Sequence, residues 1–201
     1  MKKQHVIFIF ILIMAYPTQI YSQSAIDTSI FVSINKERIK SQKQAMYVLG
    51  GWSVANIAWG AYGMSTSTQE LNRSFHEMNL MWNSINISIA TFGLISAKKE
   101  QPSGNSLSTI RSFHQAEQAF LFNTGLDLAY VMSGLYLTEL GRTRNADRLI
   151  GMGQSIMLQG GFLFVFDLVK YIQTRNNTRG LFKILDNSSF YGNGFSHTFK
   201  F

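Results

Sequence analysis

The stretch MNLMWNSINISIATFGLIS, residues 78–96, decides the fold of this chain. It lies inside a longer segment, between Glu77 and Lys98, that contains no charged residue. A helix that crosses a lipid bilayer needs about 20 mainly apolar residues, so this segment has the length and composition of a membrane span. Its polar residues are asparagine, serine and threonine, which membrane helices place against neighbouring helices.

Three other stretches of similar length are almost free of charge. No charged residue lies within 44–69. One aspartate, Asp127, interrupts 118–138, and one, Asp167, interrupts 149–169. The sequence therefore predicts an all-α membrane four-helix bundle within residues 45–172. The expected spans lie near 45–64, 76–96, 116–138 and 150–172.

The composition agrees with a membrane protein. Hydrophobic residues make up 46% of the 201 residues and charged residues 14%, against about 25% charged in ordinary soluble domains. The net charge of +7 comes from basic residues that flank the apolar stretches, where they meet anionic lipid head groups. We therefore expect the lipid bilayer as a partner and no nucleic acid. The absence of cysteine excludes disulfides and thiolate chemistry.

The first 22 residues have the order of a secretory signal peptide. Basic Lys2 and Lys3 precede the apolar run VIFIFILIMA at 6–15, and Pro17 ends it. Cleavage is expected after Ser22, with an uncleaved anchor as the alternative.

The segments on either side of the bundle are expected to differ from it. Ile26, Ile30 and Ile34 recur every four residues before a basic run, which predicts an amphipathic helix over 23–44 that either lies in the interface or leads into the first span. The long connection at 97–115 contains proline and glycine and is expected to be mobile. Residues 173–201 are expected to form a polar, partly disordered tail that rests on the interface, although its end alternates weakly like a strand.

Small and polar residues recur at helical spacing on every expected span. The stripe in the second span consists of Asn79, Asn83, Asn86, Ala90 and Gly93. The stripe in the first consists of Ser53, Asn56, Gly60 and Gly63, and that in the third of Asn123, Asp127, Tyr130 and Gly134. The stripe in the fourth consists of Gly153, Met157, Gly160, Phe164 and Asp167. Such faces suit helix contacts in lipid, so the sequence predicts an intramembrane polar core formed by Asn56, Asn79, Asn83, Asn86, Asn123, Asp127 and Asp167.

Asp127 carries the functional hypothesis, because an ionisable group near mid-span is costly. The expected spans hold no lysine or arginine at that depth. We expect Asp127 to be protonated, or hydrogen-bonded to one of three amides: Asn56, Asn86 or Asn123. It is either a relay or ligand anchor, or part of a structural network. Asp167 is expected near the span end, in a local ion pair with Lys170 three residues later.

Two histidines begin similar motifs. Ser74 to Glu77 and Ser112 to Gln115 both fit capping boxes that start helices. His76 and His114 would then lie on opposite membrane faces, too far apart to share a metal. With no catalytic arrangement in the sequence, we expect neither a metal, a cofactor nor an enzyme.

Several short motifs occur in an order that resembles a known family. They are Leu49-Gly-Gly-Trp52 with Asn56, Met78-Asn79 with Trp82-Asn83 and Asn86, Phe122-Asn123 through Asp127, and Leu158-Gln-Gly-Gly-Phe162 through Asp167. Over residues 40–172 the chain resembles an uncharacterised family of small four-span membrane proteins from Bacteroidetes-type bacteria. The resemblance implies four spans and a bacterial inner-membrane location, and it implies no activity.

The leading hypothesis is a structural or accessory membrane component, with a second copy or another membrane protein as partner. The alternative is a small transporter or channel that uses Asp127 as a titrating group. A membrane enzyme and a soluble all-helical domain remain further alternatives. Orientation stays open, because the basic residues place both ends of the bundle in the cytoplasm whereas a signal peptide would export the chain after Ser22.

Overall fold

The computed structural model describes residues 24–186, 188–191 and 194–197. The predicted all-α four-helix bundle is confirmed, and the expected signal peptide lies outside the described residues. The helices are α2 (Ser24–Thr66), α3 (Glu70–Lys99), α4 (Ser106–Arg144) and α5 (Asp147–Asp186). A short antiparallel hairpin follows, formed by β1 (Ser188–Tyr191) and β2 (Gly194–His197).

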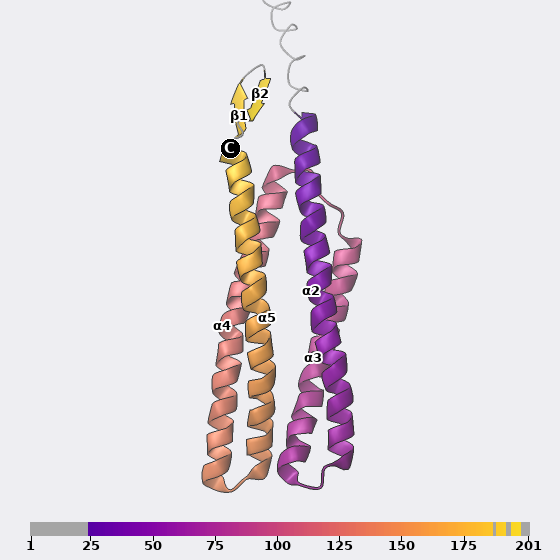
Figure 1. Ribbon diagram of the computed structural model, residues 1–201, viewed down its shortest axis with the longest axis vertical. Helices are drawn as coiled ribbons and strands as arrows, with labels where there is room; N and C mark the ends of the chain where they lie inside the picture. The colour runs from indigo at the N-terminus through magenta and orange to yellow at the C-terminus, as the bar shows by residue number, and fades with distance from the viewer. Residues whose placement is uncertain (1–23, 187, 192–193, 198–201) are drawn as a thin grey trace, which may run out of the picture.

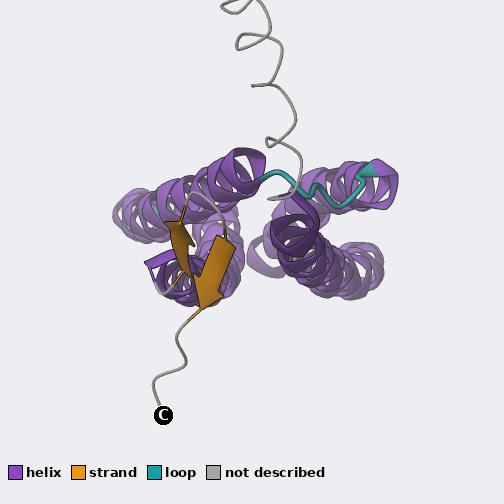
Figure 2. Cartoon of the chain, turned by 90° about the horizontal axis from the view of Figure 1, so that it is seen from above, coloured by secondary structure: helices purple, strands orange, loops and turns teal. Residues whose placement is uncertain are grey.

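The helices run up and down alternately and form two hairpins (Figure 1). Helix α2 packs along α3, and α4 packs along α5. Seen from above, the two hairpins stand as separate pairs (Figure 2). Helix α5 joins them, because it also packs against α3. The interior of the bundle is therefore built around α5.

The described part of 23–44 follows the second of its two predicted forms, a helix that leads into the first expected span. It is the first half of α2, which continues without a break into the expected span. Helix α5 likewise continues to Asp186, through much of the expected tail. The physical reason is a small apolar core, in which Phe31 of α2, Phe113 of α4 and Leu181 of α5 bury one another. These three side chains of the extensions are buried in protein contacts.

Neither predicted capping box begins a helix. Helix α3 begins at Glu70, so Ser74 lies inside it and is buried. Helix α4 begins at Ser106, because the Asn105 side chain accepts a hydrogen bond from the backbone N–H of Ser108 at 2.9 Å. An asparagine in this position satisfies one of the free amides of the first turn, so the helix starts well before Ser112.

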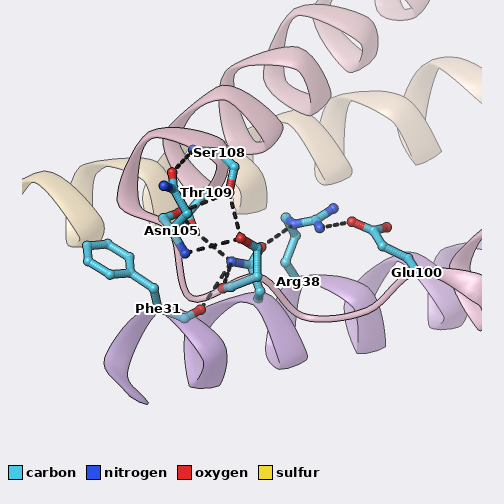
Figure 3. Close-up of polar contacts among 8 residues, drawn as sticks. Phe31, Arg38, Glu100, Asn105, Ser108 and Thr109 are labelled. Atoms are coloured by element: carbon cyan, nitrogen blue, oxygen red, sulfur yellow. Dashed lines mark hydrogen bonds and ion pairs between the residues drawn. The ribbon is translucent and has the colours of Figure 1, made fainter. Parts of the chain in front are cut away.

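The connection between α3 and α4 is held against α2 (Figure 3), and at residues 100–105 it is shorter than the loop expected over 97–115. The buried Asn35 side chain donates to the Ser103 carbonyl at 2.8 Å and to the Thr109 hydroxyl at 2.6 Å. Arg38 donates to Asn35 Oδ1 and forms an ion pair with Glu100. One turn of α2 therefore fixes the end of α3, the loop and the start of α4.

The distribution of polarity is inverted relative to a soluble protein. The side chains with no exposed surface include Asn79, Asn83 and Gln159. In contrast, Phe92 is 72% exposed and Phe122 is 68% exposed. Two helical stretches, Glu70–Lys99 and Asp147–Lys183, are long and apolar enough to cross a membrane.

Candidate functional site

The helices approach one another closely because glycines occupy the contact points. A Cβ atom on Gly134 of α4 would lie 2.6 Å from the Gly153 carbonyl of α5, and the reverse distance is also 2.6 Å. A Cβ on Gly151 would lie 2.1 Å from the Leu71 carbonyl of α3. Any side chain at these positions would force the backbones apart. The glycines therefore let α5 lie against both neighbours, which brings its polar side chains to those of α3 and α4.

Gln159 of α5 is the centre of a buried amide network. Its Oε1 accepts from Trp52 Nε1 at 2.8 Å, and its Nε2 donates to Asn79 Oδ1 and to Asn56 Oδ1. Asn79 in turn donates to the Asn56 carbonyl at 3.1 Å, and Asn83 donates to the Asn79 carbonyl at 2.8 Å. Three helices, α2, α3 and α5, are thereby linked through side-chain amides.

The predicted core residues are divided between two clusters. Asn56, Asn79 and Asn83 belong to the amide network, together with Gln159, which the sequence interpretation did not include. Gln159 was missed because it lies off the small-residue stripe of its helix. The available signal was a large amide in the middle of a charge-free stretch.

The second cluster is a pair of carboxyl groups. The side chains of Asp127 of α4 and Asp167 of α5 interact with one another, and both line one cavity together with Asn123. Asp127 is 3% exposed and Asp167 is 6% exposed. Because an ionised carboxylate can only accept hydrogen bonds, two carboxyl groups bond to one another when one of them holds a proton. Two neighbouring buried acids can therefore share one proton.

The structure overturns the expected partner of Asp167. The Lys170 ammonium group donates to Ser41 Oγ at 2.7 Å and to Gln173 Oε1 at 2.8 Å, rather than pairing with Asp167. For Asp127 the expected protonation stays a prediction, and its neighbour across the helix contact is Asp167. The physical reason is that α5 extends well beyond the expected span, so Asp167 lies within the helix packing instead of at its end.

A cavity of about 380 Å³ adjoins the carboxyl pair. Its polar lining consists of Asn86, Asn123, Asp127 and Asp167. Two buried polar atoms of this lining, Asp127 Oδ2 and Asn86 Nδ2, have no hydrogen-bond partner. Buried polar groups in proteins are nearly always paired, so these two atoms mark a place where a further molecule can bind.

The cavity also has aromatic walls. Trp82 of α3 and Tyr130 of α4 line it, with ring centroids 4.9 Å apart and the rings edge to face. Phe166 of α5 completes this lining. The site thus combines two acids and two amides with an apolar, aromatic surface.

The two histidines have separate surroundings. His76 contacts the rings of Trp59 and Phe75, and its ring occupies the space that a Cβ on Gly63 would need. His114 contacts Phe182 near the other end of the bundle. Among the described residues, no group of three or more His, Cys, Asp or Glu side chains could hold a metal ion.

These features define a class, that of a four-helix bundle with a polar interior, an apolar exterior and an acid pair beside a cavity. The chain belongs to the family of unknown function DUF6992, whose model matches residues 48–168. The match includes the amide network and both aspartates. No curated protein and no solved structure matches the chain. The family assigns no activity to it.

Proposed function

We propose that this chain is an integral protein of a bacterial inner membrane and acts as a structural or accessory component. The observation that carries the proposal is the inverted distribution of polarity. Large apolar side chains such as Phe92, Phe122 and Val165 are exposed, while Gln159 and Asn79 have no exposed surface. A soluble bundle buries its apolar stripe and exposes its polar face, whereas a bilayer permits the reverse.

The length of the helices supports this arrangement. A bilayer has a hydrocarbon core of about 30 Å, which about 20 helical residues cross. Helix α3 has 30 residues and each of the others has more. We place the helical segments next to the α2–α3 and α4–α5 turns within the bilayer, with the turns themselves at its surface. The extensions around Phe31 and Asn35 then project from it.

The amide network supports a structural role. Interhelical side-chain bonds in membranes contribute modestly, about 0.6–2 kcal/mol each, and they fix which faces meet. The bonds of Gln159 to Trp52, Asn56 and Asn79 set the rotation of α5 against α2 and α3. The exposed apolar surface then contacts lipid, a second copy or another membrane protein. In this role the chain catalyses no reaction.

Extraction of membranes with alkaline carbonate tests the membrane assignment. The full-length protein should stay in the pellet after carbonate treatment and move to the supernatant when detergent is added. Release by carbonate alone would contradict the assignment, because that treatment removes peripheral and soluble proteins.

The carboxyl pair favours a second candidate function, a small transporter or channel in which Asp127 titrates. The supporting observation is that Asp127 and Asp167 both line a cavity that has no other charged lining residue. In proteoliposomes, Asp127→Asn should abolish proton-coupled flux while folding is unchanged. The exposed Glu139 on the same helix offers a matched control, Glu139→Gln, which should retain the flux. Lost folding or assembly in Asp127→Asn would favour a purely structural network.

A further inference from the structure

We propose that the cavity beside Asp127 and Asp167 binds an organic ammonium ion that carries an apolar body. This binding site is additional to the structural role, and it does not require that the protein move ions across the membrane. The proposal rests on the charge of the pair, the unpaired polar atoms, the aromatic walls and the apolar rim of the cavity.

The charge of the site suits a monovalent cation. Two carboxyl groups that share one proton carry one negative charge between them. No lysine or arginine lines the cavity to neutralise it. Buried charges in proteins are normally paired, so the site lacks one positive charge. A divalent metal would need more oxygen ligands than this small acid pair provides.

The unpaired atoms provide places for an ammonium group to bond. Asp127 Oδ2 is buried, lines the cavity and has no partner, so it can accept an N–H. The Asn86 side chain is 4% exposed and its Nδ2 is also unpaired. Turning this amide about its terminal bond would present Oδ1 to the same ligand, because amide oxygen and nitrogen occupy equivalent positions.

The walls and the volume favour an organic cation over a bare alkali ion. Trp82, Tyr130 and Phe166 line the cavity, and aromatic faces attract ammonium groups. A volume of about 380 Å³ lies within the range of about 300–1,000 Å³ typical of small-molecule sites. A single sodium ion would leave most of this space and the aromatic surface without a partner.

The rim shows where the apolar body would lie. Ile85 and Ile89 of α3 and Leu126 of α4 line the cavity and are exposed on the outside of the bundle. The site is therefore continuous with the apolar surface between α3 and α4. An ammonium head can reach the acids while its alkyl chain stays among these side chains. A free amine and the head group of an aminophospholipid share this chemistry.

Calorimetric titration of the full-length protein, purified in an uncharged detergent, tests the proposal. The probes are n-hexylammonium chloride, the uncharged n-hexanol and sodium chloride. Hexylammonium should bind with one site per chain, and hexanol and sodium should bind at least about tenfold more weakly, because a buried charge-assisted hydrogen bond is worth that much or more. Equal binding of hexanol would overturn the proposal, as would a preference for sodium or no binding of hexylammonium.

Variants locate the binding in the cavity. Either Asp127→Asn or Asp167→Asn leaves one carboxylate, so each should retain part of the affinity. The double variant removes the charge and should weaken binding about 10- to 100-fold. Glu139→Gln removes an exposed carboxylate elsewhere on α4 and should bind like the wild type. Unchanged affinity in the double variant would contradict the proposal.

A second pair of variants keeps the test decisive if the double variant does not fold. Trp82→Phe retains an aromatic face and should bind more tightly than Trp82→Leu; equal affinities would count against the aromatic wall.

Native mass spectrometry of the purified protein then separates the two sources of an ammonium group, a free amine and a lipid head group. An aminophospholipid that hexylammonium displaces indicates a lipid ligand, whereas an unliganded chain that takes up hexylammonium indicates a free amine. If hexylammonium does not bind, the result of the carbonate extraction is unaffected. The binding proposal and the membrane assignment can therefore fail separately.

Discussion

At the scale of the residue, Gln159 and Asp127 differ in how completely they are satisfied. Gln159 uses both of its side-chain polar atoms in bonds to α2 and α3. Asp127 has a buried oxygen, Oδ2, with no partner. A satisfied amide that links three helices stabilises one packing of them, whereas an unsatisfied acid is costly unless something binds to it. We therefore assign structure to the first cluster and binding to the second.

The first prediction concerns Gln159. Replacing it in Gln159→Leu leaves the buried groups of Trp52 and Asn79 without their partner, so the free energy of unfolding should fall by about 1–3 kcal/mol. Gln118→Leu, an exposed position on α4, is the control and should change stability little. Equilibrium unfolding in mixed detergent micelles measures both. Equal stability of the two variants would refute the central place of Gln159 in the network.

At the scale of the element, α5 is held against α4 by close backbone contact. A Cβ on Gly153 would lie 2.5 Å from Thr138 Oγ1 and 2.6 Å from the Gly134 carbonyl, whereas one on Gly161 would meet nothing within 4 Å. The two glycines occupy the same helix and differ only in their surroundings. They offer a matched pair for testing the packing of the hairpin.

The second prediction uses this pair. Gly153→Ala should lower the free energy of unfolding by about 1–3 kcal/mol, because the added methyl group overpacks the interface. Gly161→Ala should raise it by about 0.5–1 kcal/mol, because alanine is the better helix former where there is room. The same unfolding assay measures both changes. Destabilisation of the two variants by similar amounts would show that α4 and α5 do not pack as described.

The third prediction concerns the connection between α3 and α4. Asn35→Leu removes the bonds from α2 to the Ser103 carbonyl and the Thr109 hydroxyl. Amides in 100–105 should then exchange hydrogen faster, while those near Gln159 keep their protection. Hydrogen exchange with mass spectrometry detects this. Unchanged exchange in the loop would mean that Asn35 does not hold it.

The elements themselves could be predicted from the sequence, but their ends could not. Each of the four expected spans lies within one helix of the structure. For 24–44 the sequence left open whether the helix is separate, because its amphipathic pattern differs from that of the expected span, although the backbone continues through both. The Asp127–Asp167 pair was missed for a related reason. A stripe of residues shows which face of a helix meets its neighbour, but it does not show how far the two helices are shifted along their axes. Here that shift brings the two acids together.

At the scale of the whole molecule, apolar side chains outside and amides inside form one consistent pattern. The outer surface carries residues such as Tyr62, Ile85 and Leu128 over several turns of three helices. Exposed apolar surface of this extent is unusual on a soluble monomer and typical of membrane or protein contact. The central claim is therefore that lipid covers this surface.

The most direct test of this claim is the labelling of single cysteines, which is clean because the chain contains none. Leu128 is 52% exposed in the bundle and lies beside Asp127. In membranes without detergent, Leu128→Cys should react with a charged, water-soluble maleimide far more slowly than Thr68→Cys or Gln101→Cys, which lie in connections. All three variants are labelled in opened vesicles, so that the reagent reaches both faces of the membrane. Labelling of Leu128→Cys as fast as the loop positions would contradict the account, because it would place this surface in water.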